Sequence, residues 1–439
     1  LTELWSVGVP PLVFDFPTVA GRVRTSEAGW VLPHDDIDAL YEKILALAFD
    51  VSEQNKVDAA LTAWQNDVGP GESTQLMGAR YLNVYRQAGG QDRAPIIAVT
   101  APADRQLQLA NASTFIRLWE RTRNSFDRNA IFVRMTPEAL LANLRSGSID
   151  GAIIQRNAVP ATMVVPLLRA FDAAGVGYMV DLDDDLLDVP SDKDPTGSYR
   201  AYAPYLQRLL VQAKGVTVST DQLVTRISEV NERVHLLPNR ISNALWRGYS
   251  ARRNPDENVR ALYFGSVTHA EDLAMIEPAI EAIQARYPHF RLAVVGIQQE
   301  ATPEWIERIA VPIHARNYSS FVPWLREQAA DFDLALAPLI DSTFNLYKSG
   351  LKAIEGAALG LPVLASDVPA FREIAAELEG LTLIPNDVDT WVLGLETAIQ
   401  QVEINRSKRD IIKAKALRSF GLQTSIPEYD DLVLNILMS

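Results

Sequence analysis

The chain has 439 residues, 48% of them hydrophobic and 22% charged, which are the proportions of a folded, multi-domain protein and exclude a disordered one. Its formal net charge of −14 argues against a nucleic-acid partner, because proteins bind nucleic acids through the phosphates with a surplus of Lys and Arg. The absence of cysteine excludes disulfides, thiolate metal sites and cysteine nucleophiles, and the five histidines do not have the spacing of zinc ligands. No apolar run approaches the roughly 20 residues of a membrane-spanning helix.

Residues 1–92 contain a pattern that returns near the end of the chain. The sequence "ELWSVGVPPLVFD" at 3–15 aligns with "EGAALGLPVLASD" at 355–367, with a glutamate, a glycine, a proline and an aspartate in step. Downstream, "GWVLPHDDIDAL" at 29–40 aligns with "LTLIPNDVDTW" at 381–391 after one residue of slippage. We therefore expect residues 1–92 to be the carboxy-terminal portion of a preceding domain of the same kind, with a further domain in a longer polypeptide. The alternative is two unrelated strand–helix units that share a Gly-x-Pro turn.

From about residue 94 short apolar runs alternate with amphipathic stretches. The runs predict strands at 95–100, 130–135, 151–156, 177–182, 215–220 and 233–238. The stretches between them predict helices near 113–123, 137–146, 162–173, 200–213 and 221–229. Alternation at this spacing predicts crossover connections and a parallel sheet with both faces covered.

The same rhythm begins again after a polar stretch at 248–258. Strands are predicted at 261–266, 291–296, 332–339, 362–367 and 381–385. Helices are predicted at 271–285, 319–330, 350–359, 371–378 and 388–402. We therefore expect an α/β protein with two Rossmann-like domains, 93–247 and 248–425, followed by an amphipathic helix within 426–439.

The start of a predicted helix near residue 350 is a candidate anion site. Ser349 is a good N-cap residue, and Gly350 would let a ligand approach the backbone. The first helical turn, with the amides of 349–351 including that of Leu351, offers unpaired N–H groups at the positive end of the helix dipole.

Charged residues follow this helix start at helical spacing. If the helical turn extends back to residue 348, Lys348, Lys352 and Glu355 share one face, and Leu351, Ile354 and Ala358 lie on another that can bury against the sheet. Two lysines suit a diphosphate, and a carboxylate one turn further on suits the two hydroxyls of a ribose. The alternative is that these residues are ordinary surface pairs on a solvated helix.

The segment that carries these residues resembles a known family. Glu355 followed by "GAALGLPVLASD" resembles the nucleotide-sugar-binding segment of glycosyltransferases of the GT-B fold, family 4 and its relatives. The form N-x-x-K-S-x-x-K-x-x-E, which begins at Asn345, is similar to a bacterial subgroup linked to surface polysaccharides such as O-antigen and capsule. Many members carry a glutamate that contacts the donor sugar where this chain has Tyr347, so the identity of the donor sugar stays open.

The resemblance implies a retaining hexosyl- or deoxyhexosyltransferase that needs no metal and no cofactor. Its donor would be a nucleoside-diphosphate sugar, and its acceptor a polysaccharide or a lipid-linked glycan. Lys348 and Lys352 would stabilise the leaving diphosphate, and Glu355 would hold the ribose. In relatives Pro238 and Asn239 lie at the hinge between the domains, and the last helix crosses back to the first domain.

Two loops of the second domain add candidate donor-binding residues. The sequence "YFGSVTHAEDL" turns from a strand into a helix at Gly265, and Ser266, Thr268 and His269 follow as hydrogen-bond donors for the donor phosphates. The alternative, an ordinary strand-to-helix turn with Thr268 as the N-cap residue, fits this sequence equally well. In the loop "HARNYSS", Tyr318 is a candidate to stack on the base, although it can equally be an exposed loop residue.

An acidic run, "MVDLDDDLLDVP" at 179–190, ends a strand of the first domain. We expect Asp183 and Asp184 to bind hydroxyls of the donor sugar or the acceptor, because the carboxyl end of this strand faces the cleft in such folds. A cation site and a solvated acidic turn are the alternatives. Arg156 lies near the same edge and meets either a ligand or the acidic run.

Other enzyme classes lack their motifs here. The chain has no Gly-x-Gly-x-x-Gly between a strand and a helix, no P-loop and no Gly-x-Ser-x-Gly. A nucleotide-sugar 2-epimerase of the same fold and a non-catalytic subunit remain as alternatives.

We expect a cytoplasmic protein that can associate peripherally with the inner face of the plasma membrane. The basic stretch 406–418 is a candidate patch for that contact, or else a solvated helix.

Overall fold

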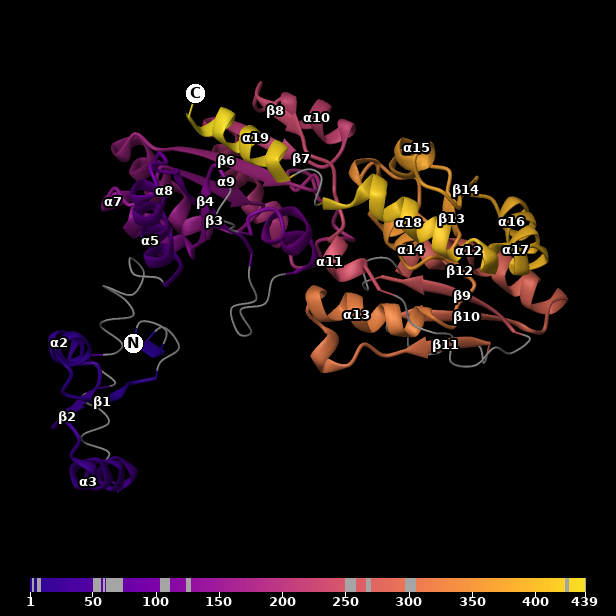
Figure 1. Cartoon of the computed structure of the whole chain (residues 1–439). Coiled ribbons are helices and arrows are strands. Elements are labelled where there is room, and N and C mark those ends of the chain that lie inside the picture. Colours follow the sequence, from indigo (N-terminus) through magenta and orange to yellow (C-terminus); the bar gives the residue numbers. More distant parts are fainter. Residues whose placement is uncertain are drawn as a thin grey trace. The chain divides into compact units, whose positions relative to one another are not determined.

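The computed structural model describes residues 1, 4–5, 9–49, 57, 60, 74–102, 111–123, 128–248, 258–265, 270–296, 305–422 and 426–438 (Figure 1). The chain forms two compact units. One unit comprises 1–100, 124–153 and 162–177, and the other comprises 101–123, 154–161 and 178–439.

The amino-terminal part of the first unit is a small α/β layer. Strands β1 (Leu12–Phe14) and β2 (Trp30–Leu32) are parallel, with helix α2 (Pro17–Ser26) between them. Helices α3 (Ile37–Phe49) and α5 (Thr74–Ala88) follow. Among the described residues of this layer, one buried cluster contains Trp5, Val23 and Ala28.

A first six-stranded sheet has the strand order β4-β3-β5-β6-β7-β8. Its strands are β3 (Ile96–Thr100), β4 (Ile131–Arg134), β5 (Gly151–Gln155), β6 (Gly177–Leu182), β7 (Gly215–Val218) and β8 (Val234–Leu236). The pairs β3–β4, β6–β7 and β7–β8 are parallel. Helices α7 (Pro137–Arg145), α8 (Ala161–Ala174), α9 (Ser198–Gln212) and α10 (Asp221–Ser228) connect the strands. Every residue of β3 and β5 is buried, as the continuous apolar runs predict.

A second six-stranded sheet has the order β11-β10-β9-β12-β13-β14, and all its pairs are parallel. Its strands are β9 (Val259–Phe264), β10 (Phe290–Val295), β11 (Ile306–Ile309), β12 (Leu334–Ala337), β13 (Val363–Ser366) and β14 (Leu381–Ile384). Its helices are α11 (Asn243–Trp246), α12 (Ala270–Arg286), α13 (Tyr318–Ala329), α14 (Leu351–Ala358), α15 (Pro369–Ala375), α16 (Val388–Gln400), α17 (Val402–Ser407) and α18 (Arg409–Phe420).

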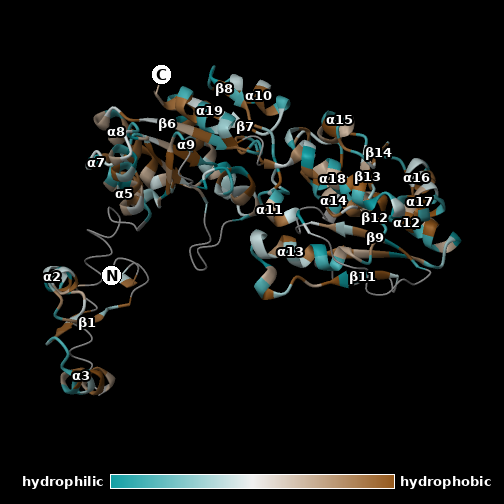
Figure 2. Cartoon of the chain, in the orientation of Figure 1, coloured by the Kyte–Doolittle hydropathy of each residue, from teal (hydrophilic) through white to brown (hydrophobic). Residues whose placement is uncertain are grey.

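Apolar side chains cover both faces of this second sheet, in two separate buried clusters. Figure 2 shows hydrophobic residues concentrated along the strands. The chain order changes direction between β9 and β12, so the carboxyl ends of these two strands border the crevice where ligands of open α/β sheets bind. The prediction of two Rossmann-like sheets is confirmed.

Two details differ from the predictions. The helix expected over 113–123 is a short α-turn, α6 (Ala112–Thr114), and a π-helix, η3 (Phe115–Trp119). This segment buries Arg117, whose Nη2 lies 2.6 Å from Asp181 Oδ1, so it is not simply amphipathic. The basic stretch 406–418 is not a solvated helix throughout, because Lys413 is 3% exposed and Arg406 Nε lies 2.8 Å from Asp333 Oδ1.

The last helix, α19 (Ile426–Met438), packs by its apolar face. A Cβ added to Gly215 of β7 would lie 3.0 Å from Ile436 Cγ2. The guanidinium of Arg121 lies 5.8 Å from the ring centre of buried Tyr429. Among the described residues, no helix is long and apolar enough to cross a membrane.

Candidate functional site

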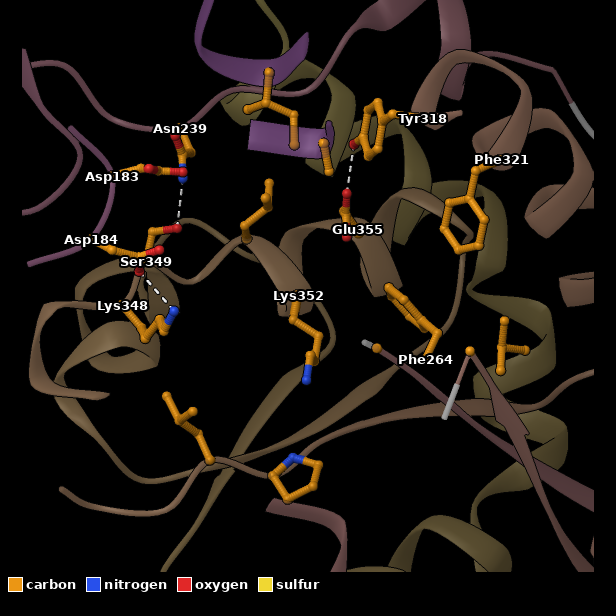
Figure 3. Close-up of a pocket in the computed structure, with 18 of the residues that line it drawn as sticks. Asp183, Asp184, Asn239, Phe264, Tyr318, Phe321, Lys348, Ser349, Lys352 and Glu355 are labelled. Atoms are coloured by element: carbon orange, nitrogen blue, oxygen red, sulfur yellow. Dashed lines mark hydrogen bonds and ion pairs between the residues drawn. The ribbon is translucent and has the colours of Figure 1, made fainter. Parts of the chain in front are cut away.

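A cavity of about 500 Å³ lies at the carboxyl ends of the central strands of the second sheet (Figure 3). Gly265 follows β9, Gly296 follows β10 and Pro338 follows β12, and all three line the cavity. On another side Asp183 and Asp184 follow β6 of the first sheet. Its size and its position at the change of strand order are those of a small-molecule site in an α/β protein.

Helix α14 brings three of the predicted site residues to this cavity. Lys352, Glu355 and Leu351 all line it. Gly350, not Ser349, is the N-cap residue, so the prediction of a serine cap is wrong. The Ser349 hydroxyl instead accepts a hydrogen bond of 2.8 Å from Asn239 Nδ2, because the chain before the helix is held against the turn that follows β8.

Lys348 reaches the cavity by a different route from the predicted one. Its φ of −69° and ψ of 147° are extended, so the helical turn does not continue back through it, and the predicted shared helix face is wrong. It nevertheless lines the same cavity as Lys352 and Glu355.

Gly350 is explained by packing rather than by ligand approach. A Cβ at this position would lie 2.5 Å from Ile374 Cδ1 and 2.7 Å from the carbonyl oxygen of Ala370, both on α15. Gly350 is also not among the residues that line the cavity. The predicted reason for this glycine is therefore wrong.

Glu355 has a partner that the sequence did not suggest. The Tyr318 hydroxyl donates a hydrogen bond of 2.6 Å to Glu355 Oε1 (Figure 3). Tyr318 is the first residue of α13 and is 7% exposed, so it is not an exposed loop residue, and its ring packs 5.3 Å from that of Phe115. Burial raises the pKa of Glu355 to about 7, and burial together with the Glu355 charge raises that of Tyr318 well above its ordinary value.

The two lysines of the site have different surroundings. Lys352 Nζ lies 4.8 Å from the ring centre of Tyr263, and burial lowers its pKa to about 8. Lys348 Nζ lies 2.7 Å from Asp184 Oδ1 and 4.8 Å from the ring centre of Phe344. One cation is therefore held against an aromatic ring, and the other is also neutralised by a carboxylate.

The acidic run is balanced by arginines. Arg156 Nη1 lies 2.8 Å from Asp183 Oδ1 and 3.4 Å from Asp184 Oδ2, so Arg156 pairs with the acidic run. Burial opposes ionisation of Asp183, but the charges of Arg156, Arg117 and Lys348 and a hydrogen bond with Ser113 together outweigh it and lower the pKa of Asp183. Among the described residues, no group of three His, Asp or Glu side chains is placed to hold a metal ion.

The remaining predicted residues divide into two groups. Ser266, Thr268 and His269 lie outside the described residues. Asn345 does not line the main cavity: its amide donates to the carbonyl oxygen of Ile340 at 2.9 Å, and it borders two smaller cavities alongside. Sequence reasoning missed several lining residues, namely Phe264, Gly296, Arg316, Phe321 and Phe371. Of these residues only Gly296 could have been predicted from the sequence, because it follows β10 as Gly265 follows β9.

Comparison with known proteins agrees with this geometry. Residues 258–401 match the family model of glycosyl transferases group 1. HepE of Anabaena, in complex with UDP-glucose, has a TM-score of 0.51 at 13% identity, over 77% of this chain and 99% of that one. The fold is GT-B. A glycosyltransferase of Rickettsia africae ESF-5 has a TM-score of 0.50 at 12% identity, over 82% of this chain and 94% of that one.

Other comparisons add less. TarM aligns at 12% identity with a TM-score of 0.48, over 68% of this chain and 58% of its own length. A search of curated proteins by sequence finds no match. The predicted resemblance to GT-B glycosyltransferases is thus confirmed for the fold and for the segment 258–401, which contains α14 and most of the cavity.

Proposed function

We propose that the chain is a glycosyltransferase that binds a nucleoside-diphosphate sugar in this cavity. The observation that carries the proposal is the convergence of Lys348, Lys352, Glu355 and the first turn of α14 on one cavity beside Gly265. This set offers positive charge and backbone N–H groups for a diphosphate, with a carboxylate beyond them for vicinal hydroxyls.

The proposed chemistry is stabilisation of a leaving group. As the glycosidic bond of the donor breaks, the diphosphate gains negative charge, and Lys348, Lys352 and the α14 amides would stabilise it in a partly dry cavity. Glu355, oriented by Tyr318, would accept hydrogen bonds from the ribose. Retention of configuration, with the diphosphate taking the proton of the acceptor hydroxyl, requires no protein nucleophile and no metal. Transfer should therefore persist in EDTA.

The donor and acceptor are the finer part of the proposal. HepE, whose fold this chain shares, was crystallised with UDP-glucose, so a UDP-hexose is the first donor to test. The acceptor would be a polysaccharide or lipid-linked glycan of the bacterial surface, bound on the side of Asp183 and Asp184. With such an acceptor, the protein would act in the cytoplasm, in peripheral contact with the plasma membrane.

A panel of nucleoside diphosphates and their sugars tests the proposal, because a ligand that binds only the folded protein raises its melting temperature. We expect one nucleoside diphosphate to raise it by several degrees and the Lys352→Met, Glu355→Gln double variant to lose the shift. If no member of the panel shifts the parent protein, the proposal is wrong.

Two further measurements separate the alternatives. A 2-epimerase converts its donor with no acceptor present, so donor incubated alone and followed by NMR must stay unchanged. A non-catalytic subunit binds donor without consuming it, so UDP must be released when a mixture of surface-glycan acceptors is added. Conversion of the donor alone, or binding without UDP release, contradicts transfer.

A further inference from the structure

Residues 9–49 have the same local architecture as residues 361–400 of the second sheet. In both segments two parallel strands flank a helix, β1–α2–β2 in one and β13–α15–β14 in the other. Each residue of β1, α2 and β2 lies 352 positions before its counterpart in β13, α15 and β14, as Asp15 does before Asp367. The helices begin at the matching residues Pro17 and Pro369.

The agreement extends to strand register and backbone hydrogen bonds. Leu12 pairs with Trp30, and their counterparts Leu364 and Thr382 pair in the same way. The Asp15 amide donates to Leu32 at 2.8 Å, and the Asp367 amide donates to Ile384 at 2.7 Å. Because a slip of one residue would turn every side chain to the opposite face, an identical register over both strands indicates one and the same supersecondary unit.

The next helix begins in the same way in both copies. Asp36 Oδ1 accepts a hydrogen bond from the third amide after it at 2.9 Å, at the start of α3. Asp387 does the same at 2.9 Å at the start of α16. The one-residue slippage in the sequence lies just before these caps, so from here the counterparts are 351 positions apart and Ile44 corresponds to Leu395.

The two copies differ in what covers them. In the second sheet α16 packs against α12, and Leu395 is fully buried with 0% exposure. Its counterpart Ile44 is 52% exposed, and Tyr41, whose counterpart Val392 packs against the buried cluster of the second sheet, is 65% exposed. Figure 2 shows hydrophobic residues along α3. We call Tyr41 and Ile44 the α3 face.

The strand shows the same difference. β13 lies between β12 and β14, whereas β1 pairs with β2 alone among the described strands. One edge of β1 thus lacks the strand that its counterpart has, on the side where β12 would lie. A free edge and an exposed apolar helix face are the two surfaces that the rest of a Rossmann-like domain would cover.

We propose that residues 9–49 are the closing part of a second Rossmann-like domain, and that β1 and the α3 face dock on a half-domain of the design of residues 258–361. That half-domain is supplied by a protein segment outside residues 1–439. It places a parallel strand beside β1, as β12 lies beside β13, and a helix against α3, as α12 lies against α16. The inference stands on this internal comparison and does not depend on the proposed function.

A graft within this chain tests the fit, with residues 258–361 as the docking half. Residues 11–49 replace residues 363–400, so that Ile44 takes the place of Leu395. Because the chain has no cysteine, a single introduced thiol reports burial directly. We expect the graft to unfold cooperatively, and the thiol of Ile44→Cys to react with a maleimide at least 100-fold more slowly in the graft than in the parent 439-residue chain.

Glu42 supplies the matched control. Its counterpart Leu393 is 64% exposed on α16, so Glu42→Cys should react equally fast in the graft and in the parent chain. Within the graft, Ile44→Asp should abolish cooperative unfolding, while Glu42→Ala leaves it unchanged.

Three results would overturn the proposal. They are equal reactivity of the Ile44→Cys and Glu42→Cys thiols in the graft, a graft that shows no cooperative unfolding, and slow labelling of Ile44→Cys in the parent chain. The last would mean that the α3 face is already covered.

Discussion

Lys348 Nζ lies 2.7 Å from Asp184 Oδ1, so a cation of the proposed diphosphate site is already paired with a carboxylate that follows β6. Both side chains are largely buried, with 24% and 17% of their surfaces exposed, where such a pair is screened less than at the surface. A diphosphate entering the cavity must compete with Asp184 for this lysine.

The first prediction follows from this competition. Asp184→Asn removes the negative charge but keeps the side-chain size, and we expect about 3- to 10-fold tighter binding of UDP by calorimetry, which is about 0.7–1.4 kcal/mol. Asp192→Asn is the control, since Asp192 is 57% exposed beside Lys193 and away from the main cavity. Unchanged or weaker binding by Asp184→Asn would show that the carboxylate does not oppose the ligand.

Lys352 should contribute to UDP binding at no cost to folding. Lys352→Met keeps the aliphatic contact with Tyr263 and removes the charge, so we expect UDP affinity to fall about 10- to 100-fold, or about 1.4–2.7 kcal/mol. The melting temperature of the free protein should not fall, because burial already disfavours the cation. Lys415→Met, at an exposed pair with Glu379, should leave affinity unchanged. Equal losses in the two variants would contradict a local effect.

The pH dependence of donor use should be narrow. Glu355, with its pKa raised to about 7, must be ionised to accept ribose hydroxyls, and Lys352, with its pKa lowered to about 8, must be protonated to meet a diphosphate. The profile of kcat/KM should therefore rise near pH 7 and fall near pH 8. In Glu355→Gln the residual activity should lose the acidic limb and keep the basic one. An unchanged acidic limb would assign it to another group.

Glu355 should also lower the stability of the free protein. Its pKa rises from an ordinary 4.5 to about 7 on folding, so the folded state holds the proton more tightly than the unfolded state. The free energy of unfolding from this group therefore falls as pH rises from about 4.5 to about 7. At pH 8 Glu355→Gln should be more stable than the parent by roughly 1–3 kcal/mol in urea unfolding, with no difference at pH 4. A less stable variant at pH 8 would contradict this.

The strands and the position of Glu355 were predictable because they depend on local patterns. Continuous apolar runs identify strands that are buried on both faces, and the run "GAALGLPVLASD" places Glu355 on the helix before β13. The contacts of the site were not predictable, because they join distant residues. Tyr318 is 37 residues from Glu355, and Asn239 is 110 residues from Ser349. A hydroxyl engaged by such a distant amide does not serve as the helix cap that its neighbours in sequence suggest.

Gly350 should tolerate no larger side chain, although its φ of −71° and ψ of 15° are open to alanine. The cost is steric, because the new Cβ would lie 2.7 Å from the rigid carbonyl of Ala370 and force α15 away from the start of α14. We expect Gly350→Ala to lower the free energy of unfolding by about 1–3 kcal/mol and to weaken UDP binding, since the α14 amides shift with the helix. Gly78→Ala is the matched control: nothing lies within 4 Å of its Cβ, and it sits inside α5, where alanine favours the helix. If the two variants unfold alike in urea, packing against α15 is not the reason for this glycine.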